Sequence, residues 1–424
     1  MKFQCDCFDT GHFRSDPVRT QIGTWVVEHH SFATPSTAHR TPIVFIGGAF
    51  QNCWSFLREV KHFLPQRPII LLDLPGQGQN SQLSGNLGFA DFADLIERFL
   101  DQQGLARVIP IGLSQGSGIA CAFARRHPER VECVILCATT QQLRPRIETT
   151  LRLSFSKLDE GCVDSFAAGV VHHLLNLPHR ASTNVTDRLI EGIRVGMVDL
   201  SDNERVRYRD NSTRLFRERL DARVSPRMLV CTARHDHLMP PFEGFALTSE
   251  GAASEFVIIE QGDHLSPIEN PRTHIALYDA FINDRPRSSV PGVVTGVAAA
   301  EMTRERRMLE RRPGRRREVF LRTSDGVESR ALLLDYNAHG CLLELLPGAP
   351  SSSDDGAVNV SIPSVGASAD AVMLPDDRGA RAIFLHDAFG TLGTMPVQTI
   401  EMPIPHLAGR RPSMAELLVA LTDE

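Results

Sequence analysis

One serine of the chain stands in a setting that is typical of a nucleophile. Ser114 is the centre of Gly112-Leu113-Ser114-Gln115-Gly116, which follows an apolar run and precedes a helical pattern. Small residues on both sides of a serine allow the chain to turn sharply from strand to helix, which exposes the hydroxyl. The pentapeptide also occurs by chance. The strand expected before it and the helix expected after it are therefore stronger evidence for a nucleophile than the pentapeptide itself. The pattern predicts acyl transfer through Ser114; the alternative is an ordinary tight turn.

The expected partners of this serine lie far along the chain. A serine hydroxyl needs a base to remove its proton, and the base needs an acid to orient it. In a fold that places its serine on a strand-to-helix turn, acid and base follow in that order at the ends of later strands. Asp236 and His264 each come just after an apolar run. We therefore expect Ser114, Asp236 and His264 to form a catalytic triad.

Three neighbours of these residues are competing candidates. Asp263 adjoins His264, but adjacent side chains diverge, so we expect it to make no productive hydrogen bond with the imidazole. His235 and His237 flank Asp236 and are expected to line the pocket or to face water.

Two backbone amides are candidates for holding the negative charge that develops on the acyl oxygen. Gln115 opens the helix after the serine, where backbone N–H groups lack helical partners. The second donor is expected from the loop Gly47-Gly48-Ala49-Phe50, whose glycines allow close backbone approach. We choose the amide of Ala49 for this oxyanion hole.

A second group of residues with chemical potential lies in the last third of the chain. The stretch Glu310-Arg311-Arg312-Pro313-Gly314-Arg315-Arg316-Arg317 precedes one apolar run, and Asp335-Tyr336-Asn337-Ala338-His339-Gly340 follows it. A solvated charged face is one interpretation, but arginines without interleaved acids repel one another. Nucleic-acid binding is another, but the surrounding segment is not basic. The third is a small phosphorylated ligand, because arginine forks onto phosphate and stacks on purines.

The elements that must position the first group alternate short apolar runs with amphipathic stretches over residues 1–283. This alternation predicts an α/β fold with a mainly parallel sheet, because several runs are continuous in Val, Ile and Leu. The expected strands are 42–46, 69–74, 108–113, 132–138, 228–232 and 256–260, and the expected helices are 54–64, 89–102, 116–126 and 271–283.

Between about residues 140 and 221 the patterns are helical alone, as in 147–158, 162–175 and 186–198. A helical insertion at this point of an open α/β sheet would cover the carboxyl edge of the strands, where ligands bind. We expect it to form a cap over the site.

The organisation changes after residue 283. Residues 284–300 contain Pro, Ser and Gly and are expected to be a linker. The last part, 301–424, is expected to open with a short helix at 302–312 and to close with one at 414–421. Between these helices, short β-runs at regular spacing predict a small β-barrel. These runs are 319–323, 329–334, 341–346, 358–362, 371–374 and 382–386.

Length and composition narrow the class of protein. A chain of 424 residues with 42% hydrophobic and 23% charged residues is expected to fold into two or three domains. A net charge of −6 argues against general nucleic-acid binding. No apolar run reaches the ~18 residues of a membrane span, and the first residues lack the apolar stretch of a secretory signal. We therefore expect a cytoplasmic protein.

The nine cysteines are then expected to be reduced. Cys5 and Cys7 form a pair that could bind metal, but no second cysteine or histidine cluster completes a ligand set. We expect no metal.

The first group of residues is similar to those of a known superfamily. Over about residues 20–283 the chain resembles the α/β-hydrolase superfamily in its Gly47-Gly48 turn, its Asp73-Leu74-Pro75-Gly76-Gln77-Gly78 turn, the Ser114 elbow, Asp236 and His264. The resemblance implies an acyl ester or thioester substrate and no cofactor for catalysis. Many members have histidine where this chain has Gly47, a difference that concerns the oxyanion loop.

Within the superfamily the chain is similar to the β-hydroxyacyl transferases that make the lipid precursor of rhamnolipids. The similarity lies in Gly48-Ala49, Ser55-Phe56, Asp73-Leu74-Pro75 and His173-Leu174-Leu175-Asn176. It implies a β-hydroxyacyl thioester, carried by CoA or an acyl carrier protein, and transfer of the acyl group to a hydroxyl.

The second group resembles the PilZ domain, a small barrel that binds cyclic di-GMP through Arg-x-x-x-Arg and Asp-x-Ser-x-x-Gly. Residues 302 to about 400 are covered by this resemblance. It implies that the arginine pair is Arg312 with Arg316, and Arg311 with Arg315 has the same spacing and stays open. The second motif is matched by Asp335 and Gly340, whereas Asn337 replaces its serine with a bulkier side chain that can still donate a hydrogen bond.

Together these residues predict a serine hydrolase or acyltransferase whose activity is regulated by cyclic di-GMP. One alternative is a non-catalytic signalling adaptor, and another is a small-molecule esterase or lactonase with an unrelated appended domain. The number of subunits stays open.

Overall fold

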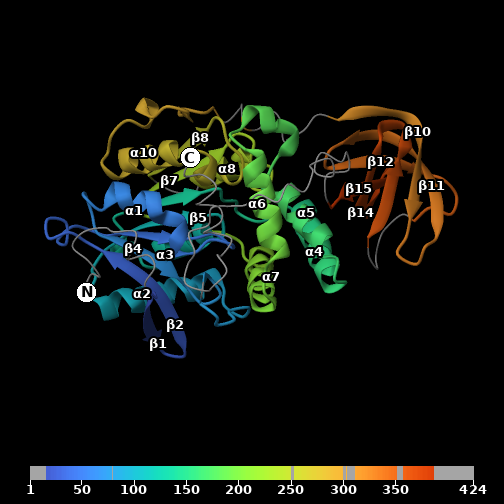
Figure 1. Ribbon diagram of the computed structural model, residues 1–424. Helices are drawn as coiled ribbons and strands as arrows, with labels where there is room; N and C mark the ends of the chain where they lie inside the picture. Colours follow the sequence, from blue (N-terminus) through green and yellow to red (C-terminus); the bar gives the residue numbers. More distant parts are fainter. Residues whose placement is uncertain are drawn as a thin grey trace.

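The computed structural model describes residues 16–385 apart from 79, 250–252, 299–301, 303–310 and 351–356. Within this part the chain forms an α/β domain, a helical cap and a closed β-barrel, which follow one another across Figure 1.

The α/β domain is built on a nine-stranded sheet in the order β1-β2-β4-β3-β5-β6-β7-β8-β9. The strands from β4 to β8 run parallel, and β1, β2 and β9 are antiparallel additions at the two edges. The central strands are fully buried runs of apolar residues, as expected for a sheet that is covered on both faces. Their bounds are β1 Val18–Ile22, β2 Trp25–Phe32, β3 Ile43–Ile46, β4 Ile69–Asp73, β5 Ile109–Leu113, β6 Cys133–Cys137, β7 Arg227–Ala233, β8 Ser254–Ile259 and β9 Val293–Val294.

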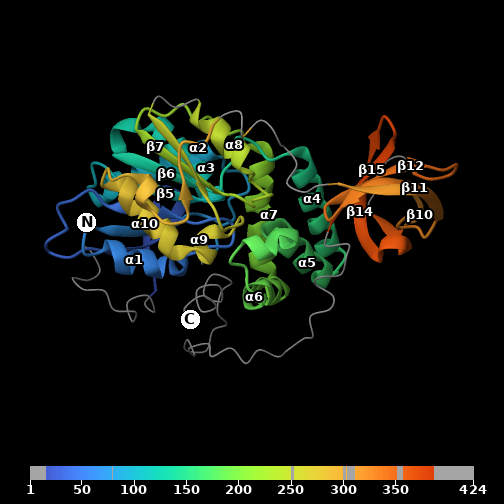
Figure 2. The same cartoon turned by 90° about the horizontal axis from the view of Figure 1, so that it is seen from above.

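Helices cover the two faces of this sheet and create two apolar layers (Figures 1 and 2). On one face α1 and α10 bury Val60, Phe63 and Phe281 against the strands. On the other face α2, α3 and α8 bury residues such as Phe92 and Ile119. The bounds are α1 Leu57–Phe63, α2 Phe89–Gln103, α3 Gln115–Arg126, α8 Pro241–Thr248, α9 Ser266–Glu269 and α10 Pro271–Ile282, with short 3-10 turns at Cys53–Phe56, Pro128–Arg130 and Arg287–Ser289.

The cap is helical, as the sequence predicts. It lies between β6 and β7 in the chain and stands between the sheet and the barrel in Figure 1. Its helices share an apolar core of their own, which includes Phe166 and Ile193. They are α4 Pro145–Asp159, α5 Val163–Leu174, α6 Asp187–Val198 and α7 Asp202–Arg217, with a 3-10 turn at Leu177–Ser182.

The C-terminal region forms a closed six-stranded antiparallel barrel in the order β10-β11-β12-β15-β14-β13. Alternate residues point inward, so small and branched side chains such as Val319, Leu333 and Ala382 fill the interior. The strands are β10 Arg312–Arg322, β11 Glu328–Asn337, β12 Gly340–Leu345, β13 Val358–Ile362, β14 Ala367–Asp376 and β15 Gly379–Phe384, with a 3-10 turn at Pro363–Val365.

In the α/β domain each predicted strand is confirmed, with its ends within two residues of those in the structure, but three strands and the helices α8 and α9 were missed. The first two strands, β1 and β2, form an antiparallel hairpin that the sequence pattern does not predict. The segment 284–300, expected to be a linker, contains β9, which pairs with β8. The helix expected at 302–312 is wrong at its end, because Arg312 already belongs to β10 and pairs with Tyr336. The helix expected at 414–421 lies outside the described residues.

The barrel packs against the cap through the β11–β12 turn and the residue that follows β15. In the β11–β12 turn, His339 Nδ1 lies 3.3 Å from Nε2 of His172 in α5. The His339 ring also stacks on His237, with centroids 4.8 Å apart and planes at 23°. Leu385, just after β15, contacts α5 at Gly169. The cap is therefore held on one side by the sheet and on the other by the barrel.

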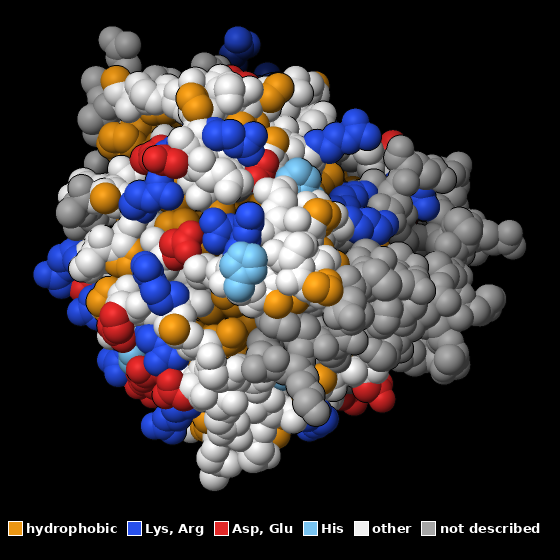
Figure 3. All heavy atoms as spheres, turned by 90° about the vertical axis from the view of Figure 1, so that its left-hand side faces the viewer, with side chains coloured by type: hydrophobic (Ala, Val, Ile, Leu, Met, Phe, Trp, Pro, Cys, Tyr) orange, Lys and Arg blue, Asp and Glu red, His pale blue; other side chains and the backbone are white. Residues whose placement is uncertain are grey.

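Figure 3 shows the end of the molecule that lies farthest from the barrel. Basic and acidic side chains are interspersed there. Among the described helices, none is long and apolar enough to cross a membrane.

Candidate active site

Ser114 stands on a strained turn between β5 and α3. Its backbone has φ 51° and ψ −116°, a conformation that costs energy for any residue with a Cβ. Two glycines make the turn possible. A Cβ on Gly112 would lie 2.3 Å from the carbonyl oxygen of Gly116, and one on Gly116 would lie 2.2 Å from that of Ile46. The Gly-x-Ser-x-Gly spacing is thus required by the packing of strand, turn and helix.

The structure brings the three predicted side chains together at the carboxyl edge of the sheet. His264 Nε2 lies 3.1 Å from Oγ of Ser114, and His264 Nδ1 lies 3.0 Å from Oδ2 of Asp236. Asp236 follows β7 and His264 follows β8, so two neighbouring strands deliver them. The distances are those of a continuous hydrogen-bond chain from the hydroxyl to the carboxylate.

The carboxylate of Asp236 is held rigidly. It is fully buried, and its second oxygen, Oδ1, accepts a hydrogen bond from the Met239 amide at 2.8 Å. A carboxylate with both oxygens engaged has one orientation available, so its Oδ2 fixes the Nδ1–H tautomer of His264. The other ring nitrogen is then free to accept the serine proton.

The electrostatics of the site favour a basic imidazole. Burial of His264 opposes protonation, but the charge and hydrogen bond of Asp236, helped by the charge of Asp263, outweigh it and raise the His264 pKa above 6.5. The imidazole is therefore a stronger base than a free histidine.

The competing residues have other roles in the structure. Asp263 accepts hydrogen bonds from its neighbour's amide, His264 N, and from the amide of Asn176 in the cap. His235 is half-buried and stacks on His179. The expectation for His237 was wrong: its ring neither lines the pocket nor faces water, because it is buried and donates from Nε2 to the carbonyl of His172 at 2.8 Å.

The predicted oxyanion donors lie on either side of the serine. Gln115 is the first residue of α3, and its side chain donates to Asn211 of the cap at 3.2 Å. Ala49 lines the same pocket as Ser114 and His264. The loop before it approaches closely, since a Cβ on Gly48 would lie 3.3 Å from the Ser114 Cβ. Gln115 directly follows the serine, and Ala49 borders the pocket, so the oxyanion hole stays a prediction.

An apolar pocket opens beside the hydroxyl of Ser114. It contains about 760 Å³ of space, including its open mouth. The cap supplies part of the apolar wall, through Leu143, Leu151, Leu174 and Ile193. Helical periodicity identified these residues as an apolar face but did not reveal that they line a cavity, since a buried core face has the same pattern.

The structure separates the predicted arginines of the barrel. Arg311 forms an ion pair with Asp335, whereas Arg316 pairs with Glu344 at 2.6 Å. Arg312 and Arg315 are exposed. Arg315 and Arg316 both have positive φ, 54° and 53°, inside an irregularity between Pro313 and Arg317 where β10 loses register with β11.

The Asp-x-Asn-x-x-Gly segment forms the β11–β12 turn. Asn337 accepts a hydrogen bond from the His339 amide at 2.9 Å, so its side-chain oxygen holds the turn. Gly340 is required for packing, because a Cβ there would lie 2.2 Å from the Ala382 carbonyl oxygen. Asp335, the first residue of this segment, forms the ion pair with Arg311. This ion pair joins the start of β10 to the segment that makes the turn.

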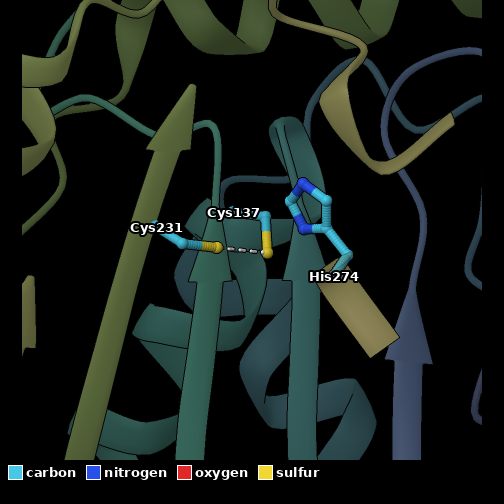
Figure 4. A group of neighbouring side chains, drawn as sticks. All are labelled: Cys137, Cys231 and His274. Carbon is cyan, nitrogen blue, oxygen red and sulfur yellow. Dashed lines mark hydrogen bonds between the residues drawn. The ribbon is translucent and has the colours of Figure 1, made fainter. Parts of the chain in front are cut away.

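One group of potential metal ligands joins β6, β7 and α10. Cys137 on β6 and Cys231 on β7 are paired neighbours with sulfurs 2.9 Å apart, and His274 of α10 points toward them (Figure 4). Both nitrogens of His274 lie within hydrogen-bond distance of hydroxyls, Tyr278 at 3.1 Å and Ser266 at 3.0 Å. The Tyr278 hydroxyl also lies 3.0 Å from Sγ of Cys137, which ties α10 to the sheet. The candidate pair Cys5 and Cys7 lies outside the described residues.

Comparison with known proteins agrees with the geometry of the α/β domain. A model of the alpha/beta hydrolase fold matches residues 41–271. A poly(3-hydroxyalkanoate) depolymerase of Ectopseudomonas oleovorans is 31% identical over 25% of this chain and 37% of its own length. A biotin biosynthesis bifunctional protein of Teredinibacter turnerae is 27% identical over 61% of this chain and 48% of its own length. The chain thus spans less than half of the length of these two relatives.

Solved structures share the fold. An alpha/beta hydrolase from a deep-sea metagenome library has a TM-score of 0.55 at 17% identity and covers 63% of this chain and 97% of its own. An esterase from Thermogutta terrifontis has a TM-score of 0.53 at 22% identity, with 64% and 99% covered. With a family model matched over more than half of its residues, the chain belongs to the α/β-hydrolase family.

Proposed function

We propose that the chain is a serine enzyme that breaks an acyl ester or thioester bond. The observation that carries this proposal is the hydrogen-bond chain from Ser114 through His264 to Asp236, at the mouth of an apolar pocket. A structural role would not require a strained serine, because strain of this kind persists only where the surrounding fold enforces it.

The proposed first step follows from the positions of these atoms. His264 Nε2 accepts the proton of Ser114, and Oγ attacks the acyl carbon. The carbonyl oxygen becomes negative and is held by the amides of Gln115 and Ala49. The tetrahedral intermediate then collapses, and His264 gives the proton to the leaving alcohol or thiol. Asp236 stabilises the imidazolium between the two transfers.

The second step repeats this chemistry with a new nucleophile. Water would give hydrolysis, and a hydroxyl compound would give acyl transfer. His264 takes the proton of the incoming hydroxyl while its oxygen attacks the acyl carbon. When the bond between the acyl carbon and Ser114 Oγ breaks, His264 returns the proton to Oγ.

The pocket supports an apolar acyl group as substrate. Its leucine and isoleucine walls offer no charged partner for the chain of the acyl group. The depolymerase relative is named for a polymer of 3-hydroxyalkanoates, which supports a β-hydroxyacyl substrate for this chain as well. We propose a β-hydroxyacyl ester, or a thioester of CoA or an acyl carrier protein.

The test is a panel of 3-hydroxyacyl esters and CoA thioesters with product mass spectrometry. We expect Ser114→Ala to lower kcat/KM at least ~10³-fold, as in other serine triads. Ser156→Ala on the exposed side of α4 is the matched control and should keep wild-type rates. A Ser114→Ala enzyme with wild-type turnover would refute the assignment. Free acid as product indicates hydrolysis, and a 3-hydroxyacyl adduct of an added alcohol or hydroxy acid indicates transfer.

For the barrel we propose a PilZ-like role in which cyclic di-GMP binds and regulates the enzyme. Support comes from the Arg311–Asp335 ion pair, which joins the arginine stretch to the Asp-x-Asn-x-x-Gly turn. Arg312 and Arg315 are exposed residues of the same strand, β10, and offer further guanidinium groups. A purely catalytic protein with an inert appendage is the alternative.

Calorimetric titration of the full chain with cyclic di-GMP tests this role. We expect heat of binding that is lost in Arg311→Gln and retained in Arg330→Gln, an exposed arginine elsewhere in the barrel. No heat at high micromolar ligand would overturn the proposal. Equal kinetics with and without saturating ligand would leave the barrel a binding module without a regulatory role.

A further inference from the structure

A buried asparagine of the cap connects three parts of the molecule. Asn211 lies on α7, and its side chain is only 1% exposed. Its Oδ1 accepts hydrogen bonds from Nε2 of Gln115 at 3.2 Å and from Nη1 of Arg214 at 2.8 Å. Its Nδ2 donates to the carbonyl of Gly76 at 3.0 Å. One amide group therefore joins the cap to α3 and to the turn that follows β4.

The partners of this amide fix its orientation. A guanidinium group can only donate, so the atom of Asn211 that faces Arg214 is the oxygen. A carbonyl can only accept, so the atom that faces Gly76 is the nitrogen. Arg214 is itself held, since it is fully buried and donates to the carbonyls of Ser84 at 2.6 Å and Leu87 at 2.7 Å. Asn211 is thus a rigid contact with one orientation.

On one side, Asn211 holds the residue whose backbone amide is the first proposed oxyanion donor. Gln115 is fully buried, and among the described residues its Oε1 has no hydrogen-bond partner. The bond from its Nε2 to Asn211 therefore fixes the side chain. Gln115 directly follows the strained turn at Ser114, so a shift of Gln115 would move its amide relative to the reacting oxygen.

On the other side, Asn211 holds the turn that supports the oxyanion loop. Gln77, in that turn, is buried and donates from Nε2 to the carbonyl of Gly47 at 3.0 Å. Its Oε1 accepts a hydrogen bond at 3.2 Å from an amide of the same turn. Gly47 lies two residues before Ala49, whose amide is the second proposed donor. Hydrogen bonds therefore run from the cap through this turn to the oxyanion loop.

From these contacts we propose that Asn211 is a positioning residue that holds both halves of the oxyanion hole from the cap. The inference rests on the proposed function, because the hole matters only if Ser114 forms a tetrahedral intermediate. It adds to that function a part for the cap in stabilising the transition state. Asn211 is not one of the described residues that line the acyl pocket, so it acts through Gln115 and the turn.

The helix that carries Asn211 also borders the acyl pocket. Tyr208 and Ser212 of α7 line this pocket. The ring of Tyr208 packs on that of Phe50, the neighbour of Ala49, with centroids 3.8 Å apart. An acyl chain in the pocket would therefore touch the element that holds the two donors. Binding of the acyl chain can in this way favour the geometry in which the donors stabilise the oxyanion.

Steady-state kinetics of the full chain with a p-nitrophenyl ester of a 3-hydroxyalkanoic acid test the inference. Asn211→Ala removes the hydrogen bonds on both sides, and Gln115→Met removes the Nε2 donor but keeps the backbone amide. We expect each variant to lower kcat about 10- to 100-fold, the effect of displacing a catalytic group by about 1 Å, and to leave KM unchanged. Asn203→Ala, at an exposed asparagine of the same helix, is the matched control and should keep the wild-type kcat and KM.

The double variant Asn211→Ala/Gln115→Met separates positioning from independent packing. Both single changes remove the same hydrogen bond, so the kcat of the double variant should be close to that of Asn211→Ala. Losses of kcat that multiply would show that the two residues act separately and would overturn the inference.

Inhibition by an alkyl trifluoromethyl ketone gives a readout that a packing role would not move. Ser114 Oγ forms a bond to the ketone carbon, His264 takes the proton of the hydroxyl, and the ketone oxygen becomes an oxyanion. This adduct needs the same two donors as the transition state. We expect its Ki to rise in each single variant by about the factor by which kcat falls. A wild-type Ki in both variants would contradict the role of Asn211.

The outcomes separate this inference from the proposed function. Asn211→Ala leaves buried donors of Arg214 and Gln115 without an acceptor, which destabilises the fold. If that variant does not fold, Gln115→Met decides, since its kcat must fall at unchanged KM. If the wild type turns over the ester through Ser114 and the folded variants keep its kcat, the inference is overturned and the proposed function stands. If the wild type shows no turnover that depends on Ser114, both fall.

Discussion

At the scale of single residues, the chemistry depends on one imidazole and its buried carboxylate. Asp236 holds His264 in one tautomer and raises its pKa against the effect of burial. The base in the first step is the neutral imidazole, so the protonated form at low pH is inactive.

This balance predicts the pH dependence of the wild-type enzyme. The value of kcat/KM should rise with pH through an apparent pKa above 6.5, because the raised pKa of His264 keeps the ring protonated to higher pH. In Asp236→Asn the charge that raises the pKa is gone, so the apparent pKa should move down while kcat falls about 10³–10⁴-fold. Initial rates from pH 5 to 9 check both effects. A wild-type profile with an apparent pKa below 6 would contradict the role of Asp236.

The triad could be predicted from the sequence because each member follows a recognisable strand. Ser114 has the glycines that its turn requires, and β7 and β8 are continuous apolar runs that mark where Asp236 and His264 begin. The contacts of His237 with His172 and His339 could not be found this way. They join residues of the α/β domain, the cap and the barrel, and no local pattern encodes which helix faces which turn.

At the scale of elements, the cap forms part of the wall of the pocket beside Ser114, so the proposed enzyme would select its substrates through the cap. Its helices contribute an apolar wall to the pocket, and α6 places Ile193 there. The sequence predicts the helices of the cap, since their periodicity is regular, but not the depth of the cavity between them. The strands β1 and β2 were missed because they carry polar and charged residues. Glu28, His29 and His30 of β2, for example, interrupt the apolar pattern that predicts a buried strand.

Changing Ile193 should therefore change the preferred acyl length. Ile193→Ala enlarges the pocket and should favour longer acyl chains, and Ile193→Phe fills it and should favour shorter ones. We expect shifts of about 10–200-fold in the ratio of kcat/KM between long and short esters, the usual effect of a methylene in an apolar pocket. The control is Arg194→Gln, the next residue on α6, which pairs with Glu191 away from the pocket. An unchanged ratio in both Ile193 variants would show that the acyl chain lies elsewhere.

At the scale of the whole molecule, the cap joins two folded bodies through buried histidines. Burial lowers the pKa of His339 well below 6.5, and the charges of Arg146, His237, His172 and His173 lower it further. The folded protein therefore keeps this ring neutral at pH values where the unfolded chain binds a proton. Because the unfolded state then binds more protons, the free energy of unfolding falls as the pH decreases below about 6.5.

The contact should consequently loosen in acid. We expect the urea midpoint of the wild type to fall between pH 7.5 and 5, with each such histidine contributing at most about 1.4 kcal/mol per pH unit. His339→Leu removes one of these histidines, so the urea midpoint of this variant should fall less between pH 7.5 and 5 than that of the wild type. His39→Leu, at an exposed histidine, should leave the slope as it is in the wild type. Equal slopes for all three proteins would show that His339 does not stay neutral in the folded state.

The most direct test of the central claim is covalent labelling with a fluorophosphonate, followed by peptide mass spectrometry. A working triad predicts a single labelled peptide that contains Ser114. It also predicts that His264→Ala slows the labelling at least ~10²-fold, because the base that activates the hydroxyl is missing. A wild-type protein that stays unlabelled at Ser114, or a His264→Ala variant that labels at the wild-type rate, would contradict the claim that these residues form a catalytic site.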